Sequence, residues 1–294
     1  MSYTIITDTS ANLPEALLKR HKVCEIPFSY CEEGEIHTCM DIEAFDGERY
    51  YNAIRSGARV STSQINPGQY MECMRPLLEK GEDILYVGMS SGISGAYASA
   101  ELAAAELREE FPQRDIRLID TYSASLGEGL LVLKAIACKA GGMALDAAAA
   151  LLLSLRHRVC QVFTVDDLLH LRKSGRISNI TAVAGTVLNI KPLLKGDELG
   201  RIVNFGKVIG RRRAVETLAA KYDMLAEEPE TQTVGIAHAD CPQEAARLAS
   251  LLMKNRPPKE IVTVCYEPVT GAHVGPGALA LFFLGGAGVR TALR

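Results

Sequence analysis

Short apolar runs, each followed by a hydroxyl-rich loop and then a helical pattern, recur three times in the first half of the chain. The runs are Tyr3 to Ile6, Ile84 to Val87 and Ile116 to Ile119. They lead into polar loops at 7–10, 90–95 and 120–123, and helical patterns follow from about 14, up to about 110 and over 125–140. Alternating strands and helices of these lengths predict a parallel sheet with right-handed crossovers.

A further hydroxyl-rich segment, Ser61-Thr62-Ser63, is interpreted as a loop that precedes a helix start at Asn66-Pro67. Asn is a preferred N-cap, and Pro suits the first helical turn because its missing N–H would be unpaired there. In a parallel sheet the strand-to-helix loops lie at the carboxyl edge, where ligands bind. We therefore expect these polar loops to converge on one crevice.

In the second half of the chain, predicted strands and helices alternate less regularly. Strands are expected over 160–165, 201–208, 233–238 and 260–264, and helices over 144–155, 167–173, 181–189, 212–226 and 242–255. The apolar stretch 278–284 is interpreted as one more helix. We predict an α/β protein of two domains, an N-terminal parallel-sheet α/β domain (1–155) and a C-terminal α+β domain (156–294). The cleft between the two domains is the expected ligand site.

Composition and charge mainly exclude classes of function. The 294 residues, 48% of them hydrophobic, suffice for two ordinary domains with apolar side chains left to line a cavity. A net charge of −3 argues against a nucleic-acid partner. The apolar stretch from 278 to 289 has 12 residues, fewer than the about 20 that span a bilayer, and the amino terminus lacks a signal-peptide pattern. We expect a cytoplasmic protein without stable membrane insertion.

The eight cysteines are scattered without a Cys-x-x-Cys pair, and the six histidines show no zinc-binding spacing. We therefore expect free thiols and neither a metal nor a cofactor.

Two motifs offer hydrogen-bond donors to an anion. The Ser90–Gly95 loop, which contains Ser94, leads into a helix N-terminus, and the Ser61–Gln64 segment includes Thr62 and Ser63. Helix capping and a solvated loop are the plainer interpretations of these motifs.

His273 lies between glycines in Gly271–Gly277, where the backbone can approach a ligand closely and the imidazole can donate to a carboxylate. A turn histidine with a backbone partner is the alternative. The sequence around Ser94, G-I-S-G-A, nearly matches the nucleophile elbow G-x-S-x-G, and Ser94, Asp240 and His273 follow the chain order of a hydrolase triad. A serine hydrolase using Ser94 is therefore an alternative function, and a module binding a sugar phosphate or nucleotide phosphate is another.

Taken together, the motifs resemble those of the DegV family, whose better understood members are the fatty-acid-binding subunits of bacterial fatty acid kinase. Singly each motif is weak, but they keep the family order nearly from end to end. The matching segments are Thr7–Pro14, Ser61–Gln64, Ser90–Tyr97, Leu171–Ser178 and His273–Ala278. The chain departs from the family pattern at Ser174, where glycine is common, and at Ile65, where proline is common.

The resemblance implies a carrier of a long-chain fatty acid, a lipid-binding protein that is not an enzyme by itself. It implies that Thr62, Ser94 and His273, with Ser63 beside them, hold the carboxylate. Arg172 and Arg176 would lie near the pocket mouth and contact the kinase catalytic subunit or a phosphate. The kinase would then form an acyl phosphate for phospholipid metabolism. We expect no catalytic residue in this chain and take a monomer as the default state.

A long acyl tail needs a deep apolar tunnel. Each buried methylene contributes about 0.8 kcal/mol, and an unpaired buried carboxylate is costly. The residues that we expect to line the tunnel are Met89, Leu281, Phe282 and Phe283. The chain contains no Walker A sequence or kinase-type glycine-rich loop, so we expect phosphoryl transfer to require a separate protein.

Overall fold

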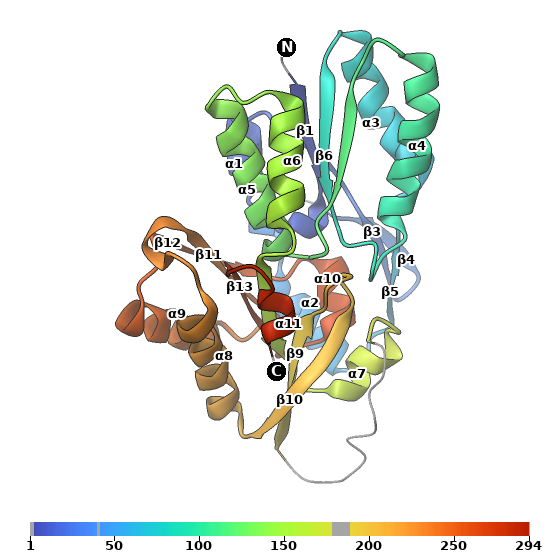
Figure 1. The fold of residues 1–294 in the computed structure, drawn as a ribbon. Helices are drawn as coiled ribbons and strands as arrows, with labels where there is room; N and C mark the ends of the chain where they lie inside the picture. The colour runs from blue at the N-terminus through green and yellow to red at the C-terminus, as the bar shows by residue number, and fades with distance from the viewer. Residues whose placement is uncertain (1–2, 40–41, 178–188, 294) are drawn as a thin grey trace.

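The computed structural model describes residues 3–39, 42–177 and 189–293. Its upper part in Figure 1 is a four-stranded parallel sheet with the order β2-β1-β6-β7. The strands are β1 (Tyr3–Asp8), β2 (Cys24–Ile26), β6 (Asp83–Gly88) and β7 (Ile116–Asp120). The parallel sheet predicted from the first three apolar runs is therefore confirmed.

Helices cover both faces of this sheet (Figure 1). On one face lie α3 (Pro67–Glu79) and α4 (Ala96–Glu110), and on the other α5 (Leu126–Ala140) and α6 (Leu145–Leu155). The short α1 (Glu15–Arg20) follows β1. The Asn66 start of α3 is a full capping box, since the Asn66 side chain accepts from the Gln69 N–H and the Gln69 side chain accepts from the Asn66 N–H.

A mixed six-stranded sheet forms the lower part, in the order β10-β9-β8-β13-β11-β12. Only the β11–β12 pairing is parallel among the described strand pairs of this sheet. Its strands are β8 (Val159–Thr164), β9 (Ile190–Gly196), β10 (Ile202–Ile209), β11 (Thr233–His238), β12 (Glu260–Cys265) and β13 (Leu279–Leu284). The helices α8 (Arg211–Leu225) and α9 (Pro242–Asn255) lie together beside it (Figure 1). The predicted α/β fold class is confirmed.

The helix α5 joins the two parts of the molecule, because it contacts β1 and β6 of the parallel sheet and also β11 and β13 of the mixed sheet. One continuous apolar core therefore contains residues from both parts, such as Leu131 and Phe282. The parallel sheet ends at residue 120 and the mixed sheet begins at residue 159. The division into residues 1–155 and 156–294 stays a prediction.

A small antiparallel sheet, β4-β3-β5, was not expected from the sequence. It contains β3 (Ser29–Glu32), β4 (Glu35–Thr38) and β5 (Val60–Ser63), and α2 (Gly47–Arg55) lies between β4 and β5 in the chain. The interpretation of Ser61-Thr62-Ser63 as a loop is therefore wrong. Thr62 pairs with Tyr30 of β3, and such a short polar edge strand depends on its partner rather than on its own apolar pattern.

The helix expected over 278–284 is also wrong, because this stretch is the strand β13 at the centre of the mixed sheet. A short apolar run does not distinguish a buried strand from a buried helix by its periodicity. Successive side chains of β13 point to opposite faces of the sheet. Phe282 therefore packs in the core shared with α5, and Phe283 packs in the core formed with α8 and α9.

Four short helices complete the described chain. They are α7 (Leu168–Lys173), α10 (Pro268–Val274), α11 (Val289–Ala292) and the 3-10 helix Thr9–Ala11 after β1, with two further 3-10 turns at Ile42–Ala44 and Pro229–Thr231. The helix expected over 181–189 falls almost entirely outside the described residues.

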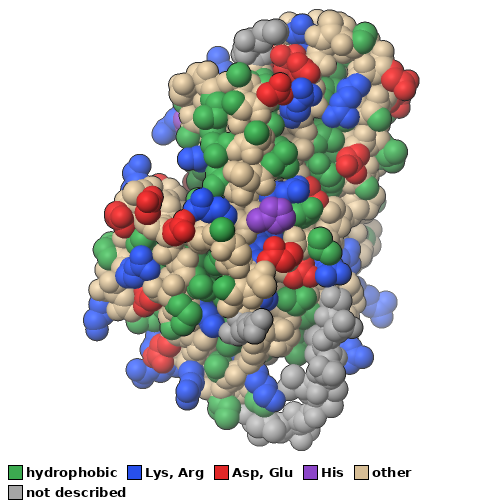
Figure 2. Space-filling model, in the orientation of Figure 1, with side chains coloured by type: hydrophobic (Ala, Val, Ile, Leu, Met, Phe, Trp, Pro, Cys, Tyr) green, Lys and Arg blue, Asp and Glu red, His purple; other side chains and the backbone are tan. Residues whose placement is uncertain are grey.

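Charges of both signs are interspersed over the face that Figure 2 shows, with hydrophobic side chains between them. This mixture agrees with the small net charge of −3. None of the helices in the described ranges is both long and apolar enough to cross a bilayer.

Candidate functional site

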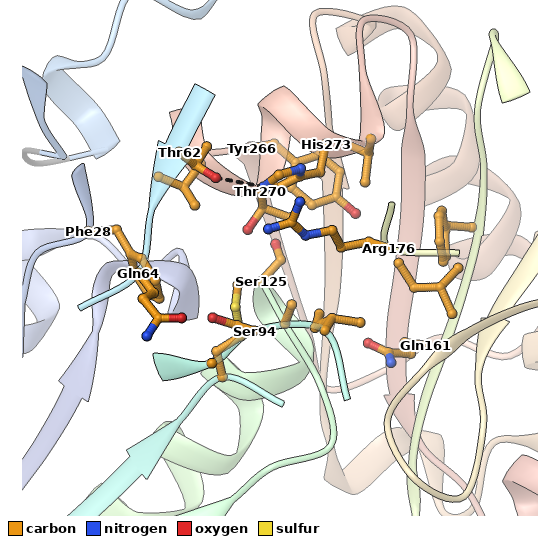
Figure 3. Close-up of a pocket in the computed structure, with 18 of the residues that line it drawn as sticks. Phe28, Thr62, Gln64, Ser94, Ser125, Gln161, Arg176, Tyr266, Thr270 and His273 are labelled. Carbon is orange, nitrogen blue, oxygen red and sulfur yellow. Dashed lines mark hydrogen bonds between the residues drawn. The ribbon is translucent and has the colours of Figure 1, made fainter. Parts of the chain in front are cut away.

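A cavity of about 310 Å³ lies where β5, α10, the start of α4, the start of α5 and the mixed sheet meet (Figure 3). Its apolar lining is Phe28, Met89, Ile93, Ala124, Phe163, Ile202, Tyr266, Val269, Val274 and Phe282. Its polar side chains are Thr62, Ser63, Gln64, Ser94, Ser125, Gln161, Arg176, Thr270 and His273. A cavity with mainly apolar walls and a few converging polar groups is typical of a small-molecule site.

Two of the predicted site residues form a hydrogen bond across this cavity. Thr62 Oγ1 of β5 lies 2.9 Å from His273 Nε2 of α10, although the two residues are 211 positions apart in the chain. The helix α10 is fixed at its start because the buried Glu267 carboxyl accepts the backbone N–H groups of Val269 and Thr270 at 2.5 and 2.6 Å. This cap sets the direction in which His273 projects, six residues after Glu267.

The imidazole of His273 is neutral at neutral pH. Burial, together with the nearby charges of Arg176 and His170, lowers the pKa of His273 to about 4. A neutral imidazole carries one ring proton. In the tautomer with that proton on Nε2, His273 donates to Thr62 and leaves the Thr62 hydroxyl hydrogen free for a ligand oxygen.

Ser94 lies in the turn that leads into α4. Its Oγ accepts the Ala96 N–H at 3.2 Å, so its own hydroxyl hydrogen remains available to a ligand. The turn packs closely against the segment before β10, because a Cβ on Gly92 would lie 2.5 Å from the Leu199 carbonyl oxygen. Glycine is therefore required at 92, and the contact holds Ser94 against the C-terminal half of the protein.

Most of the predicted site residues line one cavity. Thr62, Ser63, Ser94, Arg176 and His273 all belong to its wall, while Arg172 lies in the exposed last turn of α7 and is not part of the lining. Of the expected tunnel residues, Met89 and Phe282 line the cavity. The assignment of Leu281 and Phe283 to the tunnel is wrong, since both side chains pack in the core with α8 and α9.

The serine-hydrolase alternative is not supported. The Asp240 carboxylate forms a salt bridge with Arg55, and the described Nε2 contact of His273 is with the Thr62 hydroxyl. The carboxylate that would orient the histidine in a triad is therefore used elsewhere. Among the residues with described positions, no three His, Cys, Asp or Glu side chains form a group that could hold a metal ion.

Several polar residues of the cavity were missed in the sequence. They are Ser125, Gln161 and Thr270, whereas Gln64 belongs to the predicted donor segment Ser61–Gln64. Ser125 is an isolated serine, separated by Ala124 from the hydroxyl-rich loop at 120–123, and no pattern distinguishes it, whereas Gln161 interrupts an apolar strand and so carried a signal that a polar side chain faces inward. Thr270 carried no such signal, because α10 was not expected as a helix.

Two buried carboxyl groups, Asp8 and Glu128, lie close together near the cavity, because the backbone N–H of the lining residue Met89 donates to Asp8. Ser10 Oγ lies 2.5 Å from both Asp8 Oδ1 and Glu128 Oε2, and one hydroxyl hydrogen cannot serve both acceptors. Thr7 Oγ1 lies 2.9 Å from the Val87 carbonyl oxygen and 3.1 Å from Glu128 Oε1, and its one hydrogen can be donated to either acceptor. A proton on Glu128 or on Asp8 satisfies the Ser10 contact, and burial raises the pKa of both carboxyl groups, that of Glu128 well above its usual value.

Comparison with known proteins assigns the family. A family model described as "Uncharacterised protein, DegV family" matches residues 2–285. The "DegV domain-containing protein CPE0026" of Clostridium perfringens is 36% identical over 290 residues, which cover 96% of this chain and 97% of the relative. The chain therefore belongs to the DegV family, as its motifs predicted.

Solved structures share the fold over nearly the whole chain. A fatty-acid-binding DegV family protein from Thermus thermophilus is 30% identical, with a TM-score of 0.87 over 97% of this chain and all of the other. The fatty-acid-binding DegV family protein SAG1342 from Streptococcus agalactiae is 29% identical, with a TM-score of 0.84 over 97% of this chain and 99% of the other. Both are mixed α/β proteins of the same architecture.

Proposed function

We propose that this protein carries one long-chain fatty acid, with the acyl tail in the apolar cavity and the carboxylate held by Thr62, Ser94 and His273, with Ser63 beside them. The observation that carries the proposal is the meeting of these residues, from three distant segments, in one cavity with mainly apolar walls. The fatty-acid-binding proteins of Thermus thermophilus and Streptococcus agalactiae, which share the fold, support the same ligand class.

The physical chemistry of the cavity suits such a ligand. Burial of a long tail contributes on the order of 10 kcal/mol before the costs of binding, at about 0.8 kcal/mol per methylene. The carboxylate needs hydrogen bonds when it leaves water. Hydroxyl groups on Thr62 and Ser94 supply them without a buried counter-ion, and the neutral His273 orients the Thr62 hydroxyl.

We further propose that the bound carboxylate is presented to a separate kinase, which converts it to an acyl phosphate for phospholipid metabolism. A second, shallower depression of about 380 Å³ shares Ser94 and Arg176 with the cavity wall, so the headgroup end adjoins an open surface. Arg176 lines this depression, and the exposed Arg172 lies four positions before it in the last turn of α7, so positive charge that suits a phosphoryl donor or an acidic surface of the kinase is present near the headgroup end.

An assay of acyl phosphate formation tests the kinase step. The protein loaded with hexadecanoic acid is mixed with ATP, Mg²⁺ and the fatty acid kinase catalytic subunit, and the product is trapped with hydroxylamine. We expect the product only when both proteins are present. Changing both Arg172 and Arg176 to alanine should lower the rate at subsaturating kinase by about tenfold, because charges at an interface rim govern association.

The matched control is Lys254→Ala, which removes an exposed cation from α9 on another element. This variant should retain the native rate. Native activity in the double arginine variant would remove these side chains from the proposal, and failure of loaded protein to give any acyl phosphate would contradict the kinase step.

A further inference from the structure

Ser125 is one of two residues in the cavity lining, with Thr270, whose buried hydroxyl has no hydrogen-bond partner among the described residues. The side chain is 1% exposed and lines the cavity, yet its Oγ forms no hydrogen bond with any residue that the structure describes. Leaving a buried hydroxyl unsatisfied costs about 1–3 kcal/mol. A ligand atom that accepts this hydrogen bond would recover that cost.

The backbone of Ser125 adds a second reason to look for a use of its side chain. Its φ of 52° with a ψ of −143° is a combination that glycine adopts far more easily than serine. A serine is nevertheless present at this position. Its side chain does not cap α5 either, so the hydroxyl points into the cavity rather than back to the helix (Figure 3).

Ser125 is the N-cap of α5, a helix of 15 residues. The N-terminus of such a helix carries partial positive charge and favours an anion. The acidic residue in its first turn, Glu128, is fully buried and lies near the carboxyl of Asp8, and burial raises the pKa of Glu128 well above its usual value, which favours the neutral form that leaves this charge uncancelled. Ala124 and Ser125 bring the start of α5 to the cavity wall, so the partial positive charge of this helix end lies beside the unpaired hydroxyl.

We propose that Ser125 and the first turn of α5 form an oxyanion site that recognises the ionised carboxylate of the bound fatty acid. In Figure 3 Ser125 lies between the side of the cavity that carries Thr62 and His273 and the side that carries Ser94. A carboxylate held by Thr62, His273 and Ser94 would therefore lie in the part of the cavity that the Ser125 hydroxyl faces. The inference rests on the proposed function and narrows the ligand to the free ionised acid, excluding fatty alcohols and esters as preferred ligands.

The test compares ligands that differ only at the headgroup. Dissociation constants for hexadecanoic acid, hexadecan-1-ol and methyl hexadecanoate are measured at pH 8 by displacement of a fluorescent fatty acid. The native protein should bind the acid at least about tenfold more tightly than the alcohol or the ester. In Ser125→Ala and in Ser125→Gly, the affinity for the acid should fall about tenfold, while the affinity for the alcohol changes by less than about twofold.

The two variants separate binding from backbone conformation, because glycine relieves the strain at this φ whereas alanine keeps it. Equal losses for acid and alcohol, native acid affinity in both variants, or loss in alanine alone would each overturn the proposal. If the native protein bound the three ligands equally well, the headgroup inference would be wrong while the carrier function stood. If it bound none of them, the carrier function would itself be wrong.

Discussion

Replacing Thr62 and His273 together by alanine is expected to lower the affinity for hexadecanoic acid by about 100-fold. A hydrogen bond to a charged group contributes about 1.5–3 kcal/mol, and a carboxylate left unpaired in an apolar cavity adds a desolvation cost. Isothermal titration calorimetry with the purified, delipidated protein measures this loss directly.

The single variants add a sharper test, because Thr62 and His273 are in contact at 2.9 Å. The effects of substitutions within one hydrogen-bond network are not additive. The single variants Thr62→Ala and His273→Ala should therefore each lose nearly as much affinity for the acid as the double variant. The matched control is the double change of His37 and Thr38 to alanine on β4, whose side chains do not line the cavity. Native affinity in the Thr62 and His273 double variant would remove these residues from the site.

Arg290→Met is expected to lower the free energy of unfolding by about 4 kcal/mol, the largest stability effect that the structure predicts. The Arg290 side chain is 1% exposed and donates hydrogen bonds to five acceptors. These acceptors are the carbonyl oxygens of Tyr122, Arg156, Val159 and Asp197 and the hydroxyl of Ser123, at 2.8–3.0 Å. A methionine fills similar volume but leaves these buried acceptors unpaired.

Urea denaturation followed by circular dichroism measures this change. Burial lowers the pKa of Arg290 to about 10, so the side chain remains charged at neutral pH and its bonds are charge-assisted. The control is Arg212→Met, where an exposed arginine forms one surface ion pair with Glu216 and the expected cost is below about 1 kcal/mol. If Arg290→Met cost no more than this control, the buried network would contribute little to stability.

Local signals made the first half of the fold predictable. The apolar runs became β1, β6 and β7, and the Asn66-Pro67 signature became the start of α3. In each case the residues that determine the element lie within a few positions of one another. Such elements can be predicted from sequence periodicity, because their formation does not depend on residues far away in the chain.

Elements that depend on distant partners were missed or misread. The strand β5 is polar and exists through its pairing with β3, and β13 is apolar on both faces because helices or strands cover each side. Reading β13 as a helix also misplaced the tunnel, since alternation puts Phe282 in the cavity wall and Leu281 behind it. Neither outcome follows from the local pattern.

The site was predictable mainly through the resemblance to the DegV family. No spacing rule joins Thr62 to His273, because β5 and α10 meet only in the folded protein. Ser125 escaped attention for a related reason: an isolated serine after a polar loop has no distinguishing pattern. Its unpaired hydroxyl and its strained backbone are visible only in three dimensions.

Native mass spectrometry of the intact protein tests the central claim most directly. The protein, freed of lipid and then mixed with an excess of hexadecanoic acid, should retain a single acid molecule per chain, and this species should weaken sharply in the Thr62 and His273 double variant. A spectrum that contains only the unliganded chain after this treatment would contradict the account.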